Sequence, residues 1–147
     1  MDLKPIYSLI KTHEGLRLTP YKCPAGKPTI GLGTTIYPDG RKVTMDDKAV
    51  TEHQAWTYAK AGIDDAVNAA LKYSPNLHAH PNKLCAIADF IYNLGAGSYK
   101  GSTLRIQVNK EDWEQAAVEL LRWVHGGGKR LPGLVLRRKA EARLLLS

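Results

Sequence analysis

The sequence predicts an α+β fold, in which a small β-hairpin lobe follows a first helix and a mostly helical remainder completes the chain. Apolar residues recur every three or four positions near the N-terminus, which is the period of an amphipathic helix. That period is lost over residues 16–43 and returns over most of residues 44–147. We therefore expect one domain with a β-lobe at about 16–43, a helical lobe at about 1–15 and 44–147, and the functional cleft between them.

The first predicted helix covers about residues 3–14. Its apolar residues are Leu3, Ile6, Leu9 and Ile10. Gly15 is a natural C-terminal stop, so Glu14 falls at the helix end. An acid there faces the negative end of the helix dipole, which favours its protonated form, as an acid catalyst needs. A solvated surface glutamate is equally compatible with this position.

Residues 16–43 contain β-branched residues and glycines, and Pro38–Gly40 reads "PDG". This pattern predicts short antiparallel strands joined at that turn. Thr44 followed by Asp47 is a capping signal for the next helix. Further helices are expected over about 45–60, 62–73, 81–94, 102–109, 111–125 and 133–146. The stretch "GGGKRLPG" is expected to be a loop.

The formal charge is +7, and residues 122–147 contribute six of it, with seven basic residues against Glu141 alone. Such a surface attracts polyanions, including nucleic acid, anionic lipid and bacterial cell wall. Nothing resembles a nucleic-acid-binding motif, so no specific nucleic-acid partner is expected. No apolar run reaches membrane-spanning length, and the N-terminus does not resemble a secretory signal. Two cysteines far apart are expected to be free thiols.

Three residues of the N-terminal third are candidates for chemistry. Glycosidic cleavage needs one acid to protonate the leaving oxygen and a second group to deliver water or attack the sugar. Glu14 suits the first role, while Cys23 and Thr29 follow in the turn-rich segment. Taken singly, Cys23 is also a small apolar residue that packs, and Thr29 is also an ordinary strand residue.

The spacing of these three residues resembles a known family. "EGLRLTPYKCPAGKPTIGLG" matches the T4-type phage lysozymes, whose pattern is Glu, eight residues, Asp or Cys, five residues, Thr. "IADFIYNLGAGSYKGSTL" and "WEQAAVELLRWVHGGGKRLPGLVLRRKAEARLLL" resemble the helical part of the lambdoid-phage branch. The resemblance covers about residues 5–147.

The resemblance implies a lysozyme-like fold and a muramidase that cleaves the β-1,4 bond between N-acetylmuramic acid and N-acetylglucosamine, with inversion. It implies Glu14 as the general acid and Thr29 as a residue that holds the attacking water, without a cofactor or metal. It also implies peptidoglycan as the partner, a monomer, and an endolysin role in host lysis. We expect the protein in the host cytoplasm until release, with a holin as a candidate release factor, and then at the periplasm and cell wall.

Two positions depart from the family pattern. Cys23 stands where many members have a carboxylate, and it has three possible roles: activating water with Thr29, forming a thioglycosyl intermediate, or having no chemical role. The first is favoured, and Lys22 and Lys27 could support a thiolate. The third permits lytic transglycosylase chemistry by Glu14 alone. Thr34 replaces a histidine that many members carry after the hairpin glycines.

The resemblance also indicates supporting residues. An arginine of the last helix is expected beside Glu14, with Arg137 and Arg138 as candidates and Arg138 preferred. Asn93, Gly95, Ser102 and Thr103 fall in the segment that contacts sugar or stem peptide in the family. Gly95 and Ser102–Thr103 also suit helix caps.

Several other residues have simpler interpretations. Tyr92, Trp113 and Trp123 are expected to pack in the core. His78, His80 and Cys85 lack zinc-like spacing, so no metal site is expected.

Three rival classes remain. They are a cationic nucleic-acid-binding protein, a cysteine peptidase or amidase using Cys23 with His53 or His125, and a membrane-active module formed by "GLVLRRKAEARLLLS". The apolar residues of that last segment are more simply explained by docking on the core.

Overall fold

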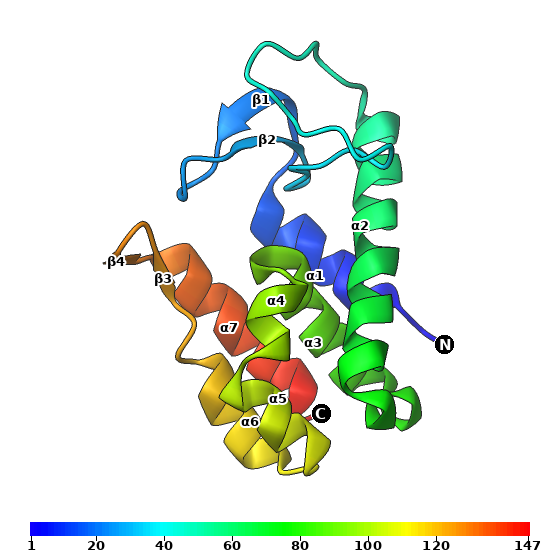
Figure 1. The fold of residues 1–147 in the computed structure, drawn as a ribbon, viewed down its shortest axis with the longest axis vertical. Coiled ribbons are helices and arrows are strands. Elements are labelled where there is room, and N and C mark those ends of the chain that lie inside the picture. Colours follow the sequence, from blue (N-terminus) through cyan, green and yellow to red (C-terminus); the bar gives the residue numbers. More distant parts are fainter.

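The computed structural model describes all residues from Met1 to Ser147. It is mainly helical with two short hairpins, which confirms the predicted α+β class (Figure 1). The helices are α1 (Lys4–Glu14), α2 (Glu52–Tyr73), η1 (Pro75–Ala79), α3 (Pro81–Leu94), α4 (Ala96–Lys100), α5 (Thr103–Asn109), α6 (Trp113–Leu120) and α7 (Pro132–Leu145). The strands are β1 (Arg17–Lys22), β2 (Pro28–Gly31), β3 (His125–Gly126) and β4 (Lys129–Arg130).

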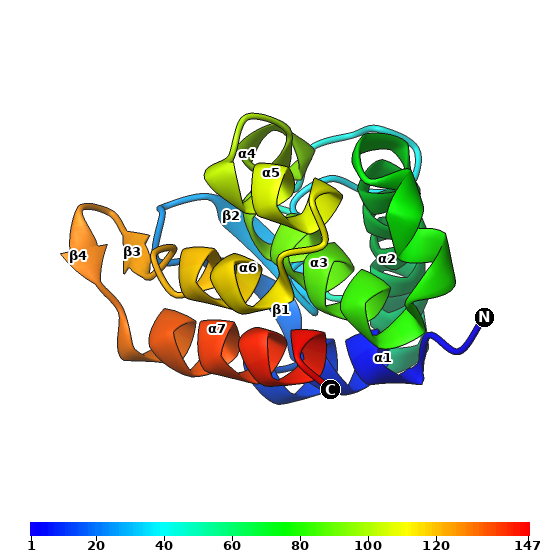
Figure 2. The ribbon, with the colours of Figure 1, turned by 90° about the horizontal axis from the view of Figure 1, so that it is seen from below.

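Helix α3 lies at the centre of the main core. Every residue from Leu84 to Ile91 is buried, so this helix is enclosed on all sides. Helices α1, α2 and α7 pack around it, and Figure 2 shows α7 and α1 on one side with α2 on another. A polar residue within that stretch of α3 must therefore find its partners inside the protein. No helix has the length and apolar character needed to cross a membrane.

Helix α7 docks on this core through part of its surface. Ala142 and Leu145 are buried, and both belong to the apolar set of the C-terminal segment. Docking therefore accounts for these two residues, whereas Leu136 and Leu146 of the same segment are exposed.

The β1–β2 hairpin forms the base of the smaller lobe (Figure 1). Its antiparallel register pairs Tyr21 with Thr29 and Lys22 with Pro28, and the register shifts between Arg17 and Tyr21. A small separate core of Ile30, Tyr37 and Val43 supports the lobe. Helix α2 runs from this lobe down the side of the helical part, so it connects the two.

Helix α2 begins later than predicted and is not interrupted. Its N-cap is Thr51, which forms a capping box with Gln54, whereas Thr44 and Asp47 bond to each other in a preceding turn. The predicted helices over 45–60 and 62–73 are thus one helix, Glu52–Tyr73. Gly62 lies within this helix and does not end it. The Tyr92 ring packs against Gly62, and a Cβ at this position would lie 3.0 Å from Tyr92 Cε2, which accounts for the glycine.

The predicted strand turn at Pro38–Gly40 is also misplaced. The hairpin turns earlier, where Gly26 N donates to Cys23 O at 2.8 Å. A turn does form at 37–40, but it is flanked only by an isolated bridge between Ile36 and Lys42. The stretch expected to be a loop contains the small hairpin β3–β4.

Candidate active site

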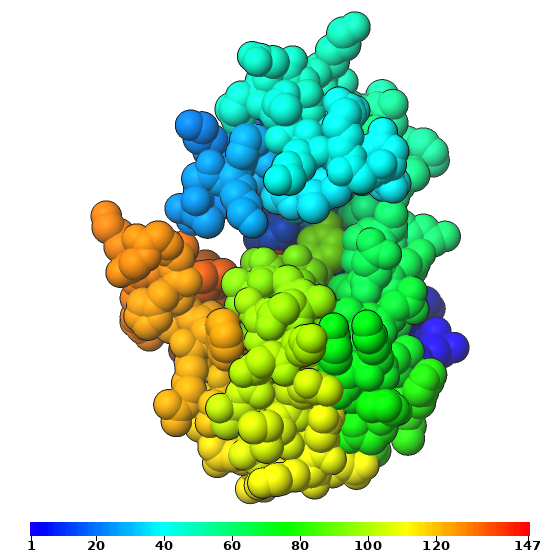
Figure 3. Space-filling model, viewed as in Figure 1, coloured from blue at the N-terminus to red at the C-terminus, as the bar shows by residue number.

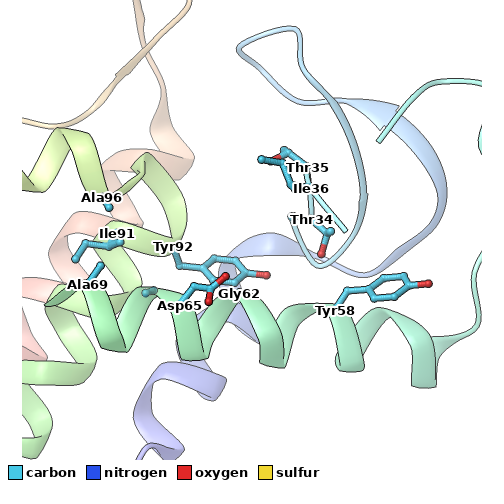
Figure 4. Close-up of a pocket in the computed structure, with 12 residues that line it drawn as sticks. Thr34, Thr35, Ile36, Tyr58, Gly62, Asp65, Ala69, Ile91, Tyr92 and Ala96 are labelled. Atoms are coloured by element: carbon cyan, nitrogen blue, oxygen red, sulfur yellow. The ribbon is translucent and has the colours of Figure 1, made fainter. Parts of the chain in front are cut away.

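A hollow separates the two lobes, and Figure 3 shows it between the blue and cyan chain above and the green chain below. Its best-defined part has a volume of about 310 Å³. The segment Gly33–Ile36 lines it from the smaller lobe, and helices α2, α3 and α4 line the rest. Figure 4 shows the Tyr92 ring reaching between α2 and Thr34. The Tyr92 hydroxyl donates to Leu32 O at 2.6 Å, which ties α3 to the smaller lobe.

Glu14 lies at the edge of this hollow because α1 ends there. Gly15 leaves the helix with a φ of +69°, so the chain turns directly into β1. The Glu14 carboxylate accepts a hydrogen bond from Arg137 Nη1 on α7, at 2.6 Å from Oε1. Its side chain keeps 15% of its exposure. The carboxylate is thus held by a cation on one side and reaches solvent on the other.

Gly33 forms the other wall around Glu14. The residue has a φ of +86°, and a Cβ built on it would meet Glu14 Oε2 and lie 2.7 Å from Cδ. Any side chain would therefore enter the space of the carboxylate. Since Gly33 also lines the hollow, Glu14 adjoins it across this glycine.

Arg137 is itself held from behind by Asp89 on α3. Its Nε and Nη2 donate to the two Asp89 carboxylate oxygens, each at 2.9 Å, while Nη1 remains for Glu14. Burial alone would lower the pKa of Arg137, but the charges of Asp89 and Glu14 outweigh it and raise the pKa. The guanidinium is therefore charged and fixed in one plane.

Cys23 and Thr29 lie near the turn of the β1–β2 hairpin: Cys23 follows the end of β1, and Thr29 on β2 pairs with Tyr21. The Cys23 amide and the Thr29 hydroxyl both donate to Lys27 O, at 3.0 and 2.9 Å. Thr29 is buried, whereas Cys23 is a free, partly exposed thiol. The pKa of Tyr21, the strand partner of Thr29, is raised by burial and by the Glu14 charge and, more weakly, by Cys23, while Arg17 lowers it. Glu14 and Cys23 thus both act on Tyr21, which pairs with Thr29.

Glu14 offers a carboxyl group, held in place beside the hollow, that can donate a proton. Across the hairpin, the Thr29 hydroxyl and the Cys23 backbone amide both donate to the Lys27 carbonyl, and neither Thr29 nor Cys23 supplies a second carboxylate. No group of His, Cys, Asp or Glu side chains has an arrangement that could hold a metal ion.

The sequence model of the family described as phage lysozyme matches residues 11–141. The chain belongs to the phage lysozyme family. An endolysin of Acyrthosiphon pisum secondary endosymbiont phage 1 is 34% identical over 143 residues, covering 95% of this chain and 93% of the relative. The chain is therefore an enzyme of the lysozyme type, a glycoside hydrolase, with a role in peptidoglycan lysis.

Two solved structures have a similar fold. The endolysin of Escherichia coli O157:H7 phage FAHEc1 superposes with a TM-score of 0.82 at 31% identity, covering 100% of this chain and 94% of that one. The muramidase domain of SpmX from Asticaccaulis excentricus has a TM-score of 0.77 at 26% identity, covering 98% and 95%. The predicted resemblance to the phage lysozymes and the predicted lysozyme-like fold are confirmed.

The preference for Arg138 as the arginine beside Glu14 was wrong. Arg137 contacts Glu14, whereas Arg138 is fully buried beside Glu141 and donates to Asn93 Oδ1 at 2.7 Å. Adjacent helix positions point about 100° apart, so only one of the two side chains can face α1. Asn93 is therefore part of an internal contact through this oxygen.

The other expected binding residues occupy helix ends. Gly95 is the C-cap of α3 with a φ of +94°. Ser102 is the N-cap of α5: its hydroxyl accepts from Arg105 N at 3.0 Å and donates to Tyr99 O at 2.7 Å. Thr103 opens α5 and is exposed. The capping interpretation holds for Gly95 and Ser102, and sugar contact by these residues stays a prediction.

The three aromatic residues pack against the core as predicted. Tyr92 does more, since it also lines the hollow. His80 packs on Trp113 with ring centroids 5.2 Å apart, and buried Cys85 lies beside Asp2 at the chain start.

Sequence reasoning missed Gly33, Tyr92 and Asp89 as parts of the site. Gly33 carried a signal, because a glycine in a turn-rich segment often allows a close approach. Asp89 also carried one, since it is the only acid in the apolar run "LCAIADFIYNL". A charge at the centre of a buried helix requires a partner from another element.

Glu141 should make the stability of the protein depend on pH. Burial and a hydrogen bond with Asp89 raise its pKa well above the ordinary value of 4.5, so the folded protein keeps this carboxyl protonated when the unfolded chain has lost the proton. Its contribution to stability is therefore complete below about pH 4.5 and declines as pH rises. Glutamine does not titrate, so we expect the melting temperature of Glu141→Gln, relative to that of the parent, to rise as the pH increases from about 4 to about 8. A thermal melting series checks this, and a relative loss at the higher pH would contradict it.

Proposed function

We propose that this phage lysozyme hydrolyses the β-1,4 bond between N-acetylmuramic acid and N-acetylglucosamine in peptidoglycan, with Glu14 as the general acid. The observation that carries the proposal is the position of Glu14: its carboxylate bonds to Arg137 at 2.6 Å, abuts the Gly33 backbone and borders the interlobe hollow. A general acid requires such a fixed carboxyl within reach of the bond to be broken.

In the proposed reaction Glu14 protonates the glycosidic oxygen as the bond to the anomeric carbon breaks. Water attacks the opposite face of the sugar and inverts its configuration, and Cys23 acts as the base that takes the proton that the water loses. Thr29 and Cys23 are proposed to hold that water. A joint role is supported by their common place at one end of the hairpin, where the Thr29 hydroxyl and the Cys23 backbone amide both donate to Lys27 O, at 2.9 and 3.0 Å.

A second candidate is a lytic transglycosylase, in which the 6-hydroxyl of the sugar replaces water. One observation favours it: a free thiol stands at Cys23, where a carboxylate would serve as base. A neutral thiol is a weak base, so water delivery from this side would be less effective. Glu14 alone would then suffice.

The wider role follows from the proposed reaction. We propose that a monomer degrades the peptidoglycan of the host during lysis, and that it stays in the host cytoplasm until released. A holin is a candidate for that release. The concentration of positive charge in residues 122–147 supports attraction to the anionic wall.

Purified peptidoglycan distinguishes this reaction from the other bond cleavages. Muramidase action is expected to release reducing ends without new free amines. An amidase or peptidase that used Cys23 would release amines without reducing ends, and that result would overturn the proposal. Wall lysis without new ends of either kind would indicate a non-enzymatic, membrane-directed action.

A series at Cys23 tests its proposed role with water. We expect Cys23→Asp to retain activity, because a carboxylate is a competent base, and Cys23→Ser to lose about ten-fold or more, because a hydroxyl is a poorer one. Initial rates of reducing-end release measure this, and circular dichroism checks folding. If Cys23→Ala matched the parent, the thiol would only pack. Cys85→Ala, in the core away from the hairpin, controls for loss of a thiol.

A further inference from the structure

A buried group of ionisable side chains lies behind Glu14, and the proposed reaction does not by itself require it. Asp89, Arg137, Arg138 and Glu141 are all buried, and none is more than 2% exposed. They come from α3 and α7, the two helices that pack along the centre of the helical lobe. Burying charged side chains gives little net stability even when they are paired. A role in the active site would account for their burial better than stability does.

Arg137 contacts Asp89 through two of its nitrogens and Glu14 through the third. Its Nε and Nη2 both bond to Asp89 at 2.9 Å, so the pair is a two-pronged contact that fixes the plane of the guanidinium. With that plane fixed, Nη1 can point only along one line, and it meets Glu14 Oε1 at 2.6 Å. Asp89 reaches the carboxylate only through the arginine.

The charges are as important as the geometry. A positive charge beside a carboxyl favours its ionised form, but a general acid must hold a proton. An arginine without a counter-charge would fix Glu14 in place and also work against its protonation. The Asp89 carboxylate offsets this charge at the far side of the same guanidinium.

We propose that Asp89 is a positioning residue for catalysis: it orients Arg137 so that Nη1 holds Glu14, and it neutralises that arginine so that Glu14 can carry its proton. The proposal rests on the proposed role of Glu14 as general acid. Burial opposes the ionised state of Asp89, but hydrogen bonds from Glu141 and Arg137 outweigh burial and lower its pKa, which is consistent with a charged carboxylate.

Other groups around the acid must be considered in any pH measurement. Helix α7 contributes Arg138 and Glu141, α3 contributes Tyr92, α1 contributes His13 and β1 contributes Tyr21. The pKa of Tyr92 is raised by burial and by the Glu14 charge, and that of His13 is lowered by burial and by Arg137. Both are therefore uncharged above neutral pH. Glu141 is the group whose titration Asp89→Asn also changes, because its hydrogen bond with Asp89 helps to raise its pKa.

The test compares Asp89→Asn with the parent on soluble glycan fragments over a range of pH. We expect kcat to fall about ten- to a hundred-fold with little change in KM, because the acid is misplaced while the sugar-binding surface is intact. We also expect the alkaline limb of kcat to move about one unit toward lower pH, because the uncompensated arginine favours ionised Glu14. Arg137→Gln should move the limb the other way.

Asp47→Asn is the matched control. Asp47 accepts hydrogen bonds from Tyr37 and Thr44 in the small lobe, so its loss weakens a local network without touching Glu14. It should lower the melting temperature and leave the pH profile in place. If Asp89→Asn behaved in the same way, Asp89 would be only structural and the proposal would be overturned.

Two further variants keep the test decisive. If Asp89→Asn fails to fold, the double variant Asp89→Asn/Arg137→Gln removes both charges. This variant should lose kcat but keep the alkaline limb of the parent. A limb moved to lower pH would overturn the proposal. Glu14→Gln distinguishes failure of the proposed function from failure of the inference about Asp89. Activity in that variant would refute the proposed function, whereas an inactive Glu14→Gln beside an unchanged Asp89→Asn profile would refute only this inference.

Discussion

Replacing Glu14 with glutamine is expected to reduce the release of reducing ends from peptidoglycan by at least about 100-fold, since general acid catalysis contributes that much or more. Glutamine has nearly the same shape, and its carbonyl can still accept the hydrogen bond that Arg137 Nη1 makes at 2.6 Å. What it cannot do is give a proton to the leaving oxygen. The loss should therefore appear in kcat, with KM and the melting temperature close to those of the parent.

Glu114→Gln is the matched control for this variant. Glu114 is an exposed acid in the first turn of α6 and lies outside the hollow. It should keep full activity, which shows that loss of one negative charge does not itself weaken wall binding. Retention of more than about a tenth of the activity by Glu14→Gln would rule out Glu14 as the acid.

Gly33→Ala is expected to cost activity and stability together. A Cβ at this position would meet Glu14 Oε2, and the φ of +86° is unfavourable for alanine. The carboxylate would have to move away from Arg137, and a displacement of about 1 Å of a catalytic group can cost about 100-fold in rate. We expect a loss of kcat of that order and a lower melting temperature.

Gly40→Ala separates the two effects of that substitution. Gly40 has a φ of +90°, but nothing lies within 4 Å of a Cβ placed there. It should show the backbone strain of about 1 kcal/mol and full activity. If Gly33→Ala were equally active, contact between Gly33 and the carboxylate would have no part in catalysis.

The parts of the fold that follow from local pattern were predicted well. Ile6 and Ile10 are buried as their spacing indicates, and Gly15 ends α1 so that Glu14 closes the helix. The start of α2 was missed although its signal was present, because Thr51 and Gln54 form a capping box that competes with the weaker pair Thr44 and Asp47.

The parts of the site that depend on packing between elements could not be predicted in the same way. Whether Arg137 or Arg138 faces Glu14 depends on the rotation of α7 about its axis, and both arginines are buried. Apolar periodicity does not set that rotation here, because charged residues occupy buried positions of α7. The two hydrogen bonds between Arg137 and Asp89 depend likewise on how α3 packs against α7.

The central claim is that a proton from Glu14 and a water molecule cleave the glycan, and it is tested most directly by digesting peptidoglycan in water enriched in oxygen-18 and weighing the products. Hydrolysis predicts muropeptides with reducing ends that carry one oxygen-18 atom, formed by the parent and absent with Glu14→Gln. Products lighter by one water, with anhydro ends and no isotope, would contradict the hydrolytic account and establish the transglycosylase.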